Sequence, residues 1–337
     1  MKNIIILVDD RGFFYSSIRE RGSSMNVEKI KKNLEKLGYL VSIKGFYEIN
    51  FNDSYKNKIV LYQSTEDPDL RYKNYIEDVL LGLQNLGVIL IPGLNEFRAH
   101  HNKVFMEVLR DVKGLNKKTN IYTKKYGTLD EFVSDTKGHI FPMVIKPSLG
   151  SRSKNIYRVD NLGEAIKKIK KISKTFTLVN LKRAFQSIID GKGYKKISNF
   201  RNKFIVQNYI FGLKGDYKIL VYGDKFYVLE RKNRKRDFRA SGSGLFSFPE
   251  TLPEGLLDYS LEMFNEFKVP FISMDIAVKD SSFYLIEFQF VSFGQLTLEK
   301  SDFYFKKSDS WQKIDSKSDL EETFVDSVDK YINLYIK

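Results

Sequence analysis

Apolar residues in the first hundred positions follow two alternating patterns. Short uninterrupted runs, such as Ile4 to Val8, end at polar or glycine-containing loops and predict buried strands. Between them, apolar residues recur three and four positions apart, which predicts one helix ending at Gly38 and another ending at Gly87. The strand-like runs are residues 4–8, 39–43, 58–62 and 88–91. Strands and helices alternating at these lengths predict an α/β unit with a mostly parallel sheet, closed by a further helix near residues 102–110.

Two loops of this first unit follow predicted strands and carry polar side chains. Parallel sheets bind their ligands beyond the C-terminal ends of the strands. The segments Asp9–Ser17 and Gln63–Arg71 are therefore candidate substrate loops. Ordinary connecting loops are the alternative interpretation of both segments.

The pattern changes from about residue 116 onwards, where strand pairs with tight turns are separated by helices. Gly223-Asp224, flanked by apolar runs, predicts a hairpin. A second hairpin is expected to join residues 273–278 to 283–288 through the turn Asp280-Ser281-Ser282. This part of the chain is therefore of the α+β type. The lysine-rich residues 164–203 are expected to form helices and a loop on its outside, not a polynucleotide site.

Composition narrows the chemistry that the chain can perform. Hydrophobic residues make up 42% of the chain and aromatic residues 14%, which suffices for a sizeable core. There is no cysteine, so disulfides and thiolate metal sites are excluded, and three histidines give little support for a zinc site. The apolar run at the N-terminus is too short for a signal peptide, and no run approaches the roughly 20 residues of a membrane helix. We therefore expect a cytoplasmic protein without a membrane span.

The net charge of +14 points to nucleic acid, an anionic membrane or small phosphorylated ligands as partners. The 20 tyrosines and 27 phenylalanines mostly occupy periodic core positions, and no basic and aromatic array of the kind that stacks bases is evident. A lysine-rich, solvated surface is therefore the favoured interpretation, and nucleic acid is not expected as a partner.

A strand and a small-residue loop predict the first candidate site. The apolar strand from Phe141 ends at Lys146, and the following loop contains Gly150, Ser151 and Ser153. A lysine at a strand end offers a point charge to a phosphate, and small residues let backbone N–H groups approach phosphate oxygens. An ordinary turn is the alternative.

The second expected hairpin predicts a metal site. Glu287 and Gln289 share one face of a strand because side chains alternate. An odd-length hairpin loop would place Asp275 opposite Glu287 on that face. Such carboxylates repel unless a cation neutralises them, and oxygen ligands suit Mg²⁺. Two separately salt-bridged acids are the alternative, and a register change of one residue would move Asp275 to the other face.

A basic segment forms the third candidate. Glu230-Arg231-Lys232 is followed by Asp237-Phe238-Arg239 and a loop that contains Ser241. Guanidinium groups beside a glycine- and serine-rich loop suit a transferring phosphoryl group. A basic surface turn is the alternative.

Taken in order, these segments resemble the ATP-grasp superfamily, in particular the ribosomal protein glutamate ligases and related peptide-forming enzymes. The matching text covers about residues 100–290 and includes Val144-Ile145-Lys146-Pro147, Ile205-Val206-Gln207-Asn208-Tyr209-Ile210, Gly215-Asp216-Tyr217-Lys218, Val221-Tyr222-Gly223-Asp224-Lys225, Asp237-Phe238-Arg239, Met274-Asp275-Ile276-Ala277 and Leu285-Ile286-Glu287-Phe288-Gln289. The resemblance implies a Rossmann-like N-terminal domain, residues 1–115, and two α+β lobes, residues 116–205 and 206–337, that clasp ATP between them.

The resemblance also implies roles for individual residues. Lys146 and Lys103 would bind ATP phosphates, with Ser151 and Ser153 in the adjoining loop. The remaining assignments are Gln207, Asn208 and Tyr209 for adenine, Asp216 for ribose, Arg239, Ser241 and Arg231 for the phosphoryl-transfer site, and Asp275, Glu287 and Gln289 for Mg²⁺.

Three departures from the family pattern bear on the metal, the adenine and the acceptor substrate. Gln289 stands where asparagine is usual, and Asn208 where an acid is common. The segment Phe290-Val291-Ser292-Phe293-Gly294 stands in place of the usual serine-proline-glycine motif on the acceptor side. The last departure implies a different substrate from that of the glutamate ligases, whereas Gln289 bears on the metal geometry and Asn208 on the adenine assignment.

The implied activity is amide-bond formation by an ATP-dependent carboxylate–amine ligase. ATP would phosphorylate a carboxylate, and an amine would then attack the acyl phosphate, with Asp9, Asp10 or Glu66 as candidate bases. The substrates would be small molecules or peptides, in peptide, natural-product or surface-glycan assembly. A nucleotide-binding pseudoenzyme or regulator is the first alternative, and a basic nucleic-acid-associated protein is the second. Homodimers are common in the superfamily, and no feature of this sequence decides that state.

Overall fold

The chain forms two compact units in the computed structural model. The structure describes residues 2–14, 25–64, 70–135, 139–150, 155–175, 189, 197–234, 237–240 and 242–336. One unit, here called the split unit, joins Met1–His100 to Leu213–Lys337, and the middle unit is His101–Gly212. The division at residues 115 and 205 stays a prediction, because these two units group the chain differently. None of the helices in the described ranges combines the length and apolar character that crossing a membrane would require.

A parallel sheet of four strands forms the N-terminal part of the split unit, as the hydrophobic pattern predicts. Its strands are β1 (Asn3–Val8), β2 (Leu40–Gly45), β3 (Ile59–Tyr62) and β4 (Ile89–Ile91) in the order β2-β1-β3-β4. All three strand pairs are parallel. The accompanying helices are α1 (Val27–Lys36), the short 3-10 helix η2 (Phe46–Glu48), α2 (Arg71–Asn85) and α3 (Leu94–His101). The helix α3 was not expected from the sequence.

Local signals in the sequence explain the limits of these helices. The side-chain oxygen of Asn26 accepts a hydrogen bond from the Lys29 N–H at 3.0 Å and caps the start of α1. The chain leaves α1 through Gly38 at φ 87° and leaves α2 through Gly87 at φ 78°, in the left-handed region that glycine adopts without strain. The apolar stripe of α1 buries Ile30 and Leu34 completely.

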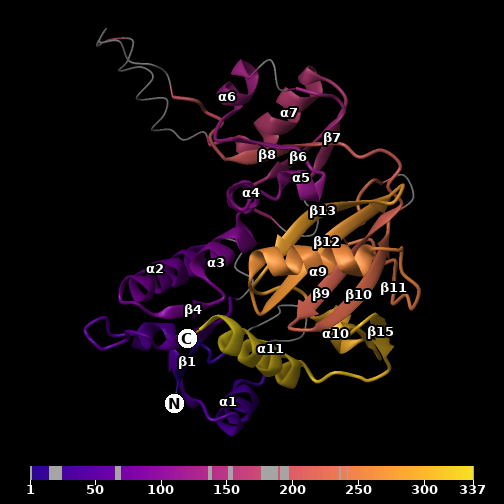
Figure 1. Cartoon of the computed structure of the whole chain (residues 1–337). Helices are drawn as coiled ribbons and strands as arrows, with labels where there is room; N and C mark the ends of the chain where they lie inside the picture. The colour runs from indigo at the N-terminus through magenta and orange to yellow at the C-terminus, as the bar shows by residue number, and fades with distance from the viewer. Residues whose placement is uncertain are drawn as a thin grey trace. The chain divides into compact units, whose positions relative to one another are not determined.

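An antiparallel sheet forms the C-terminal part of the split unit (Figure 1). Its strands are β9 (Gly215–Tyr222), β10 (Lys225–Lys232), β11 (Phe246–Ser247), β12 (Phe271–Lys279), β13 (Ser282–Gln289), β14 (Tyr304–Lys307) and β15 (Trp311–Ile314). The order is β13-β12-β9-β10-β14-β15, and β11 also pairs with β10. The helices are α9 (Leu256–Phe267), α10 (Leu296–Glu299) and α11 (Leu320–Tyr335).

The two faces of this antiparallel sheet are covered by different helices. On one face, Phe267 of α9 packs its ring 4.6 Å from that of Phe288 on β13. On the other, α11 joins the two sheets of the split unit in one core, where Phe324 contacts both Phe14 and Phe271 at 5.5 and 5.1 Å between ring centroids. The N-terminal and C-terminal segments therefore fold as one body.

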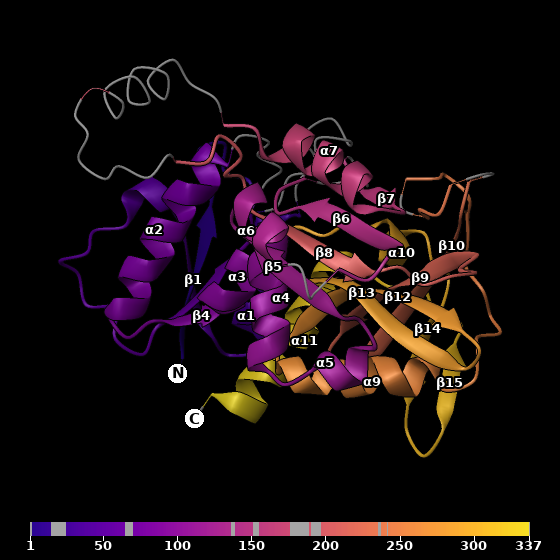
Figure 2. The same cartoon turned by 90° about the horizontal axis from the view of Figure 1, so that it is seen from above.

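The middle unit contains a second antiparallel sheet. Its strands are β5 (Thr123–Tyr126), β6 (Met143–Pro147), β7 (Tyr157–Val159) and β8 (Phe204–Asn208) in the order β5-β8-β6-β7. Its helices are α4 (Lys103–Val112), α5 (Asn116–Thr119), α6 (Leu129–Ser134) and α7 (Leu162–Ser173). Figures 1 and 2 show α6 and α7 together on one side of this sheet. The helix α7 confirms part of the expected lysine-rich helices, whereas residues 176–188 and 190–196 lie outside the described residues.

Gly215 allows β9 and β10 to approach closely beside the charged residues described below. A Cβ at this position would lie 2.1 Å from the backbone carbonyl oxygen of Arg231, and a backbone atom cannot rotate away. Gly215→Ala should therefore force the two strands apart and lower the free energy of unfolding by about 1–3 kcal/mol, measured by urea denaturation. The matched control is Gly294→Ala, since a Cβ at Gly294 would meet nothing within 4 Å. Equal stability of both variants would contradict this account.

Candidate functional site

The strand end that was expected to hold phosphate is tied to the first turn of α4. Lys146 is 8% exposed on β6, which pairs with β8 and β7. The Ser148 carbonyl accepts a hydrogen bond from the Lys103 N–H at 2.9 Å, and the Ser148 hydroxyl donates to Asn102 at 2.8 Å. The Lys103 ammonium donates to the Gly150 carbonyl at 2.8 Å. The fold thus brings Lys103 to the small-residue loop, while Ser151 and Ser153 lie outside the described residues.

The residues expected at the adenine have polar partners inside the middle unit. Gln207 is 4% exposed, and its amide donates to Glu107 at 3.1 Å and to Thr123 at 3.0 Å. Asn208 accepts from the Tyr122 N–H at 2.8 Å. These side chains hold β8 and β5 in register, and Gln207 also bonds to the buried acid Glu107. The adenine role therefore stays a prediction.

The ring of Tyr209 is the third side chain of that expected set. The Arg158 guanidinium lies 4.6 Å from the centre of the ring. A cation over an aromatic face is attracted by the ring quadrupole. This contact fixes the tyrosine at the end of β8, where its adenine role also stays a prediction.

The hairpin of β12 and β13 places Asp275 directly opposite Glu287, as expected. The expected reason was wrong, because Ser282 pairs with Lys279 and the loop is only two residues long, Asp280 and Ser281. Both loop residues have positive φ, 48° and 60°, as a type I′ turn requires. A register shift next to Asp275 leaves Ile286 as an extra residue on β13. This β-bulge, not the loop, brings the two acids together.

Five charged residues lie together on this face of the sheet, and we call them the charged cluster: Asp216, Lys218, Arg231, Asp275 and Glu287. Arg231 on β10 donates to both oxygens of Asp216 at 2.6 and 2.8 Å. Its Nη2 also lies 2.8 Å from Asp275 Oδ2. Lys218 on β9 donates to the Ser273 hydroxyl at 2.7 Å and lies 3.7 Å from Asp275 Oδ1.

The fixed cations neutralise most of the negative charge in the cluster. Burial disfavours the charge of Asp275, but Arg231 and Lys218 outweigh it, so the pKa of Asp275 is lower than its ordinary value. Burial lowers the pKa of Lys218, although Asp275 opposes that effect. With all five groups ionised, three carboxylates and two cations leave one net negative charge, and burial raises the pKa of Asp216, which reduces that charge further. The expectation that a metal must neutralise these acids is therefore too strong.

The donor set nevertheless fits Mg²⁺. Within the described residues, Asp275 Oδ1 is buried and has no hydrogen-bond partner, although the Lys218 ammonium lies 3.7 Å from it. Gln289, opposite Ser273, adds an amide oxygen on the same face as Glu287. No group of three or more acidic, histidine or cysteine side chains in the described ranges could hold a metal, so such a site depends on Gln289 and on ligand oxygens.

Arg239 lies in an irregular segment and is held by an acid two residues earlier. Its guanidinium donates to both oxygens of Asp237 at distances of 2.7 to 3.1 Å. Hydrogen bonds from Arg239 lower the pKa of Asp237. The side chain of Arg239 is 35% exposed, and Ser241 lies outside the described residues. The local ion pair is the feature expected of a basic surface turn, so the role of Arg239 in phosphoryl transfer stays a prediction.

Ser292 attaches the segment after β13 to the end of β3, a contact that the sequence did not reveal. The Ser292 N–H donates to Gln63 at 2.9 Å, and the Ser292 hydroxyl accepts from the Ser64 N–H at 3.0 Å and donates to the Ser64 carbonyl. The buried Lys73 donates to the Ser64 hydroxyl at 2.9 Å. The segment that departs from the family pattern thus packs on one of the candidate substrate loops. Its partners are more than 200 residues away in sequence, so no local signal could have found them.

Asp9, at the end of β1, shapes its own loop. Its carboxylate accepts from the backbone N–H groups of Arg11 and Phe13, both at 2.9 Å, and pairs with the Arg11 guanidinium at 2.7 Å. This engagement leaves Asp9 a poor candidate for a general base. Asp10 is exposed, and Glu66 lies outside the described residues.

The charged cluster predicts a difference in stability between two neutralised acids. Asp275→Asn removes the charge that both Arg231 and Lys218 require, so the free energy of unfolding should fall by about 3 kcal/mol. Glu287→Gln leaves both ion pairs of Arg231 in place and should therefore lower stability less than Asp275→Asn does. Urea denaturation of the two variants measures the difference. A larger loss in Glu287→Gln than in Asp275→Asn would contradict the charge balance.

Comparisons with solved structures find the same arrangement of sheets in ATP-grasp proteins. D-cycloserine synthetase DcsG matches with a TM-score of 0.56 and 11% identity, over 97% of this chain and 99% of that one. A RimK domain ATP-grasp protein of Sphaerobacter thermophilus matches with a TM-score of 0.54 and 9% identity, over 97% of this chain and 98% of that one. The ATP-grasp ligase PsnB, complexed with precursor peptide PsnA2 and AMPPNP, matches with a TM-score of 0.51 and 12% identity. The match covers 97% of this chain and 96% of that one. No family model and no curated protein matches the sequence. The likeness in fold spans nearly the whole chain, and the protein therefore has the ATP-grasp fold.

Proposed function

We propose that this protein is an ATP- and Mg²⁺-dependent ligase that joins a carboxylate to an amine. The observation that carries the proposal is the cross-strand pair Asp275 and Glu287, with Gln289 on the same face. The buried Asp275 Oδ1 has no hydrogen-bond partner among the described residues. A buried acceptor of this kind is costly unless a ligand uses it. In a chain with the ATP-grasp fold, a magnesium ion that accompanies ATP accounts for this arrangement.

Lys146 and Lys103 supply the positive charge for the ATP phosphates in this proposal. The hydrogen bond from Lys103 to Gly150 places that lysine at the loop that contains Ser151 and Ser153. Backbone N–H groups of such a loop bind phosphate oxygens without a side chain. Gln207, Asn208 and Tyr209 at the end of β8 would serve the adenine, and Asp216 the ribose.

Asp275, Glu287 and Gln289 would hold the magnesium ion, which would offset the negative charge of the ATP phosphates. The ion pair at 2.8 Å lets Arg231 keep Asp275 ionised. Arg231 would therefore support metal binding through Asp275 and would not bind the metal itself. Arg239 and Ser241 would contact the phosphoryl group that is transferred. The protein contributes position and charge to this step and needs no covalent group of its own.

The proposed reaction has two steps. An oxygen of the substrate carboxylate attacks the γ-phosphorus of ATP, the bond to the ADP oxygen breaks, and an acyl phosphate forms. The amine nitrogen then attacks the acyl carbon, phosphate leaves, and the amine loses a proton. Asp10, which is exposed, is the candidate base that would take this proton. Asp9 is less suited, because it is paired with Arg11 in its own loop.

The substrates are assigned only by class, as a small-molecule or peptide carboxylate and an amine. Two similar structures, of PsnB and of the macrocyclase MdnC, are described as complexes with precursor peptides. Ser292 and Gln63 join the segment after β13 to a candidate substrate loop, and this segment departs from the glutamate ligases. A step in peptide, natural-product or surface-glycan assembly is consistent with these features.

A nucleotide-binding pseudoenzyme or regulator is the second candidate function. The observation in its favour is that Arg231 already binds Asp275 Oδ2, and Lys218 lies beside Oδ1. These cations compete with a metal for the same carboxylate. Release of phosphate that requires both an acid and an amine separates a ligase from a pseudoenzyme.

Loss of the Lys146 charge should weaken ATP binding. A charged hydrogen bond contributes about 1.5–3 kcal/mol, so Lys146→Ala should raise the Kd for ATP about ten- to hundredfold in calorimetry. Lys117→Ala is the matched control, because Lys117 is an exposed lysine of the same unit. An unchanged Kd in Lys146→Ala, with the fold intact by circular dichroism, would remove Lys146 from the site.

The proposed metal site is tested by phosphate release with ATP, Mg²⁺ and pairs of acids and amines. Glu287→Gln should lose about 10²–10³-fold in turnover, because one ligand charge is missing where charge develops. Mg²⁺ should raise the Tm of the parent only with ATP present, and the variant should lack that increase. Gln289→Asn, which keeps an amide oxygen, should retain activity. Full activity in Glu287→Gln would refute magnesium binding by this cluster.

A further inference from the structure

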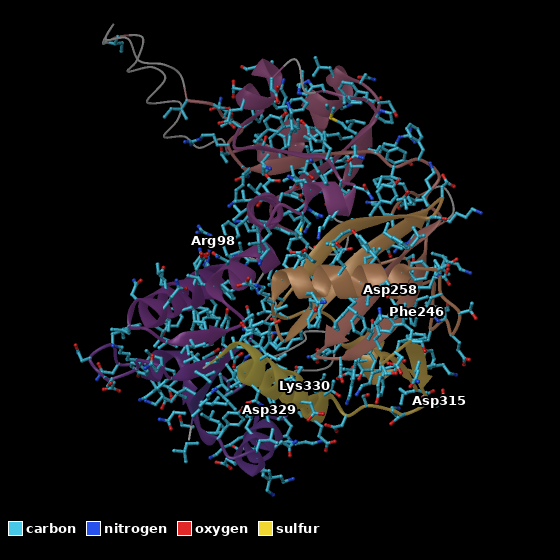
Figure 3. All side chains as sticks on the ribbon, viewed as in Figure 1. Arg98, Phe246, Asp258, Asp315, Asp329 and Lys330 are labelled. Carbon is cyan, nitrogen blue, oxygen red and sulfur yellow. The ribbon has the colours of Figure 1, made fainter. Side chains whose placement is uncertain are left out.

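A cavity of about 610 Å³ lies in the split unit at the turn between β9 and β10. The last turn of α9 and the C-terminal half of α11 form its sides. Figure 3 labels Lys330 on α11 and Asp258 on α9, the two helices that border it. Lys218 of the charged cluster is five residues from Gly223 along β9, about 17 Å at the usual rise of a strand. The cavity is therefore separate from the proposed metal site.

The walls of the cavity are mostly apolar and aromatic. Phe226 is 1% exposed and Val269 is 6% exposed, and both belong to the lining. Phe264, Leu261 and Tyr331 line the sides. A volume of several hundred Å³ with such walls is typical of pockets that enclose a small organic molecule. A ligand of this cavity would therefore have an apolar body.

Positive charge predominates in the lining of the same cavity. Lys268, Lys307 and Lys330 line it, against the single acid Asp224. Asp224 is already paired with Lys306 at 2.8 Å and with Lys330. Lys307 is paired with Asp258 at 2.6 Å, so an anionic ligand would depend on Lys268. Lys268 and Asn265, one helical turn earlier, are exposed at the open side of the cavity, and in the part of the chain that the structure describes neither side chain has a hydrogen bond or ion pair. An anionic group would complement this end of the cavity.

Lys268 adopts a backbone conformation that glycine adopts at several other helix ends. Lys268 ends α9 in the left-handed region, at φ 53° and ψ 57°. The chain leaves α1, α2 and α4 in that region through glycines, Gly38, Gly87 and Gly114. A residue with a Cβ adopts this conformation at a steric cost that glycine avoids. Lysine thus adds an ammonium group to the cavity at a position where glycine would form the turn with less strain.

We propose that this cavity binds a small amphipathic anion, with an apolar aromatic or aliphatic body and one carboxylate, sulfonate or phosphate group. Lys268 and Asn265 bind the anionic group. Phe226, Phe264 and Leu261 surround the apolar body. The proposal stands independently of the ligase activity. None of these residues belongs to the charged cluster or to the small-residue loop after Lys146.

Fluorescence titration of the full chain with 8-anilinonaphthalene-1-sulfonate, an aromatic anion, tests the chemistry of the ligand. The probe should bind saturably to one site, and decanoate should displace it. Decyltrimethylammonium has a similar apolar chain and the opposite charge, and it should displace the probe at least about tenfold less well. Equal displacement by the two compounds would overturn the proposal.

Three variants test the location of the site. Lys268→Gly should weaken probe binding at least about tenfold while unfolding at the parental Tm or slightly above it, because glycine relieves the left-handed turn. Leu261→Trp should fill the cavity and abolish saturable binding. Lys32→Ala, an exposed lysine of α1, is the matched control and should bind as the parent does. Parental affinity in Lys268→Gly, or saturable binding that persists in Leu261→Trp, would refute the site.

Discussion

The ion pairs of Arg231 hold together three neighbouring strands at the proposed metal site. Arg231 on β10 bonds to Asp216 on β9 and to Asp275 on β12, at distances between 2.6 and 2.8 Å. Its side chain is 12% exposed, so an unpaired charge there would be costly. The close approach of the strands at Gly215 brings these groups within reach. The positions of Asp275 and Glu287 depend on this arrangement.

The same ion pairs explain how three acids can share one face of a sheet before any ligand binds. Lys218 and Arg231 provide enough positive charge to lower the pKa of Asp275. The cations leave Asp275 Oδ1 without a hydrogen-bond partner among the described residues, so this oxygen can still serve a cation. Arg231 pairs with Oδ2 of this carboxylate, and the Lys218 ammonium lies 3.7 Å from Oδ1. A magnesium ion at Oδ1 would therefore have to compete with Lys218, which is the point at which the ligase and pseudoenzyme proposals differ.

Hydrophobic periodicity predicted much of the architecture because burial imposes it directly on the sequence. The runs at residues 4–8 and 58–62 became β1 and β3, and the glycines at positions 38 and 87 follow the predicted helices. The short helix α3 was missed because eight residues with two histidines carry a weak apolar pattern. The hairpin loop between β12 and β13 was misjudged because Ser282 can serve equally as a turn or a strand residue.

The sequence by itself determined the parallel sheet and the helix ends, since hydrophobic spacing and turn residues are local properties, while the residues suited to phosphate and magnesium stay predictions from residue chemistry. Only the tertiary structure decided that a bulge at Ile286 pairs Asp275 with Glu287. It also decided that Gln207 bonds to Glu107 in the interior, and that Ser292 attaches to Ser64 across more than 200 residues. Such contacts depend on how distant strands meet, and the free energy of that packing is not encoded in the spacing of any one segment.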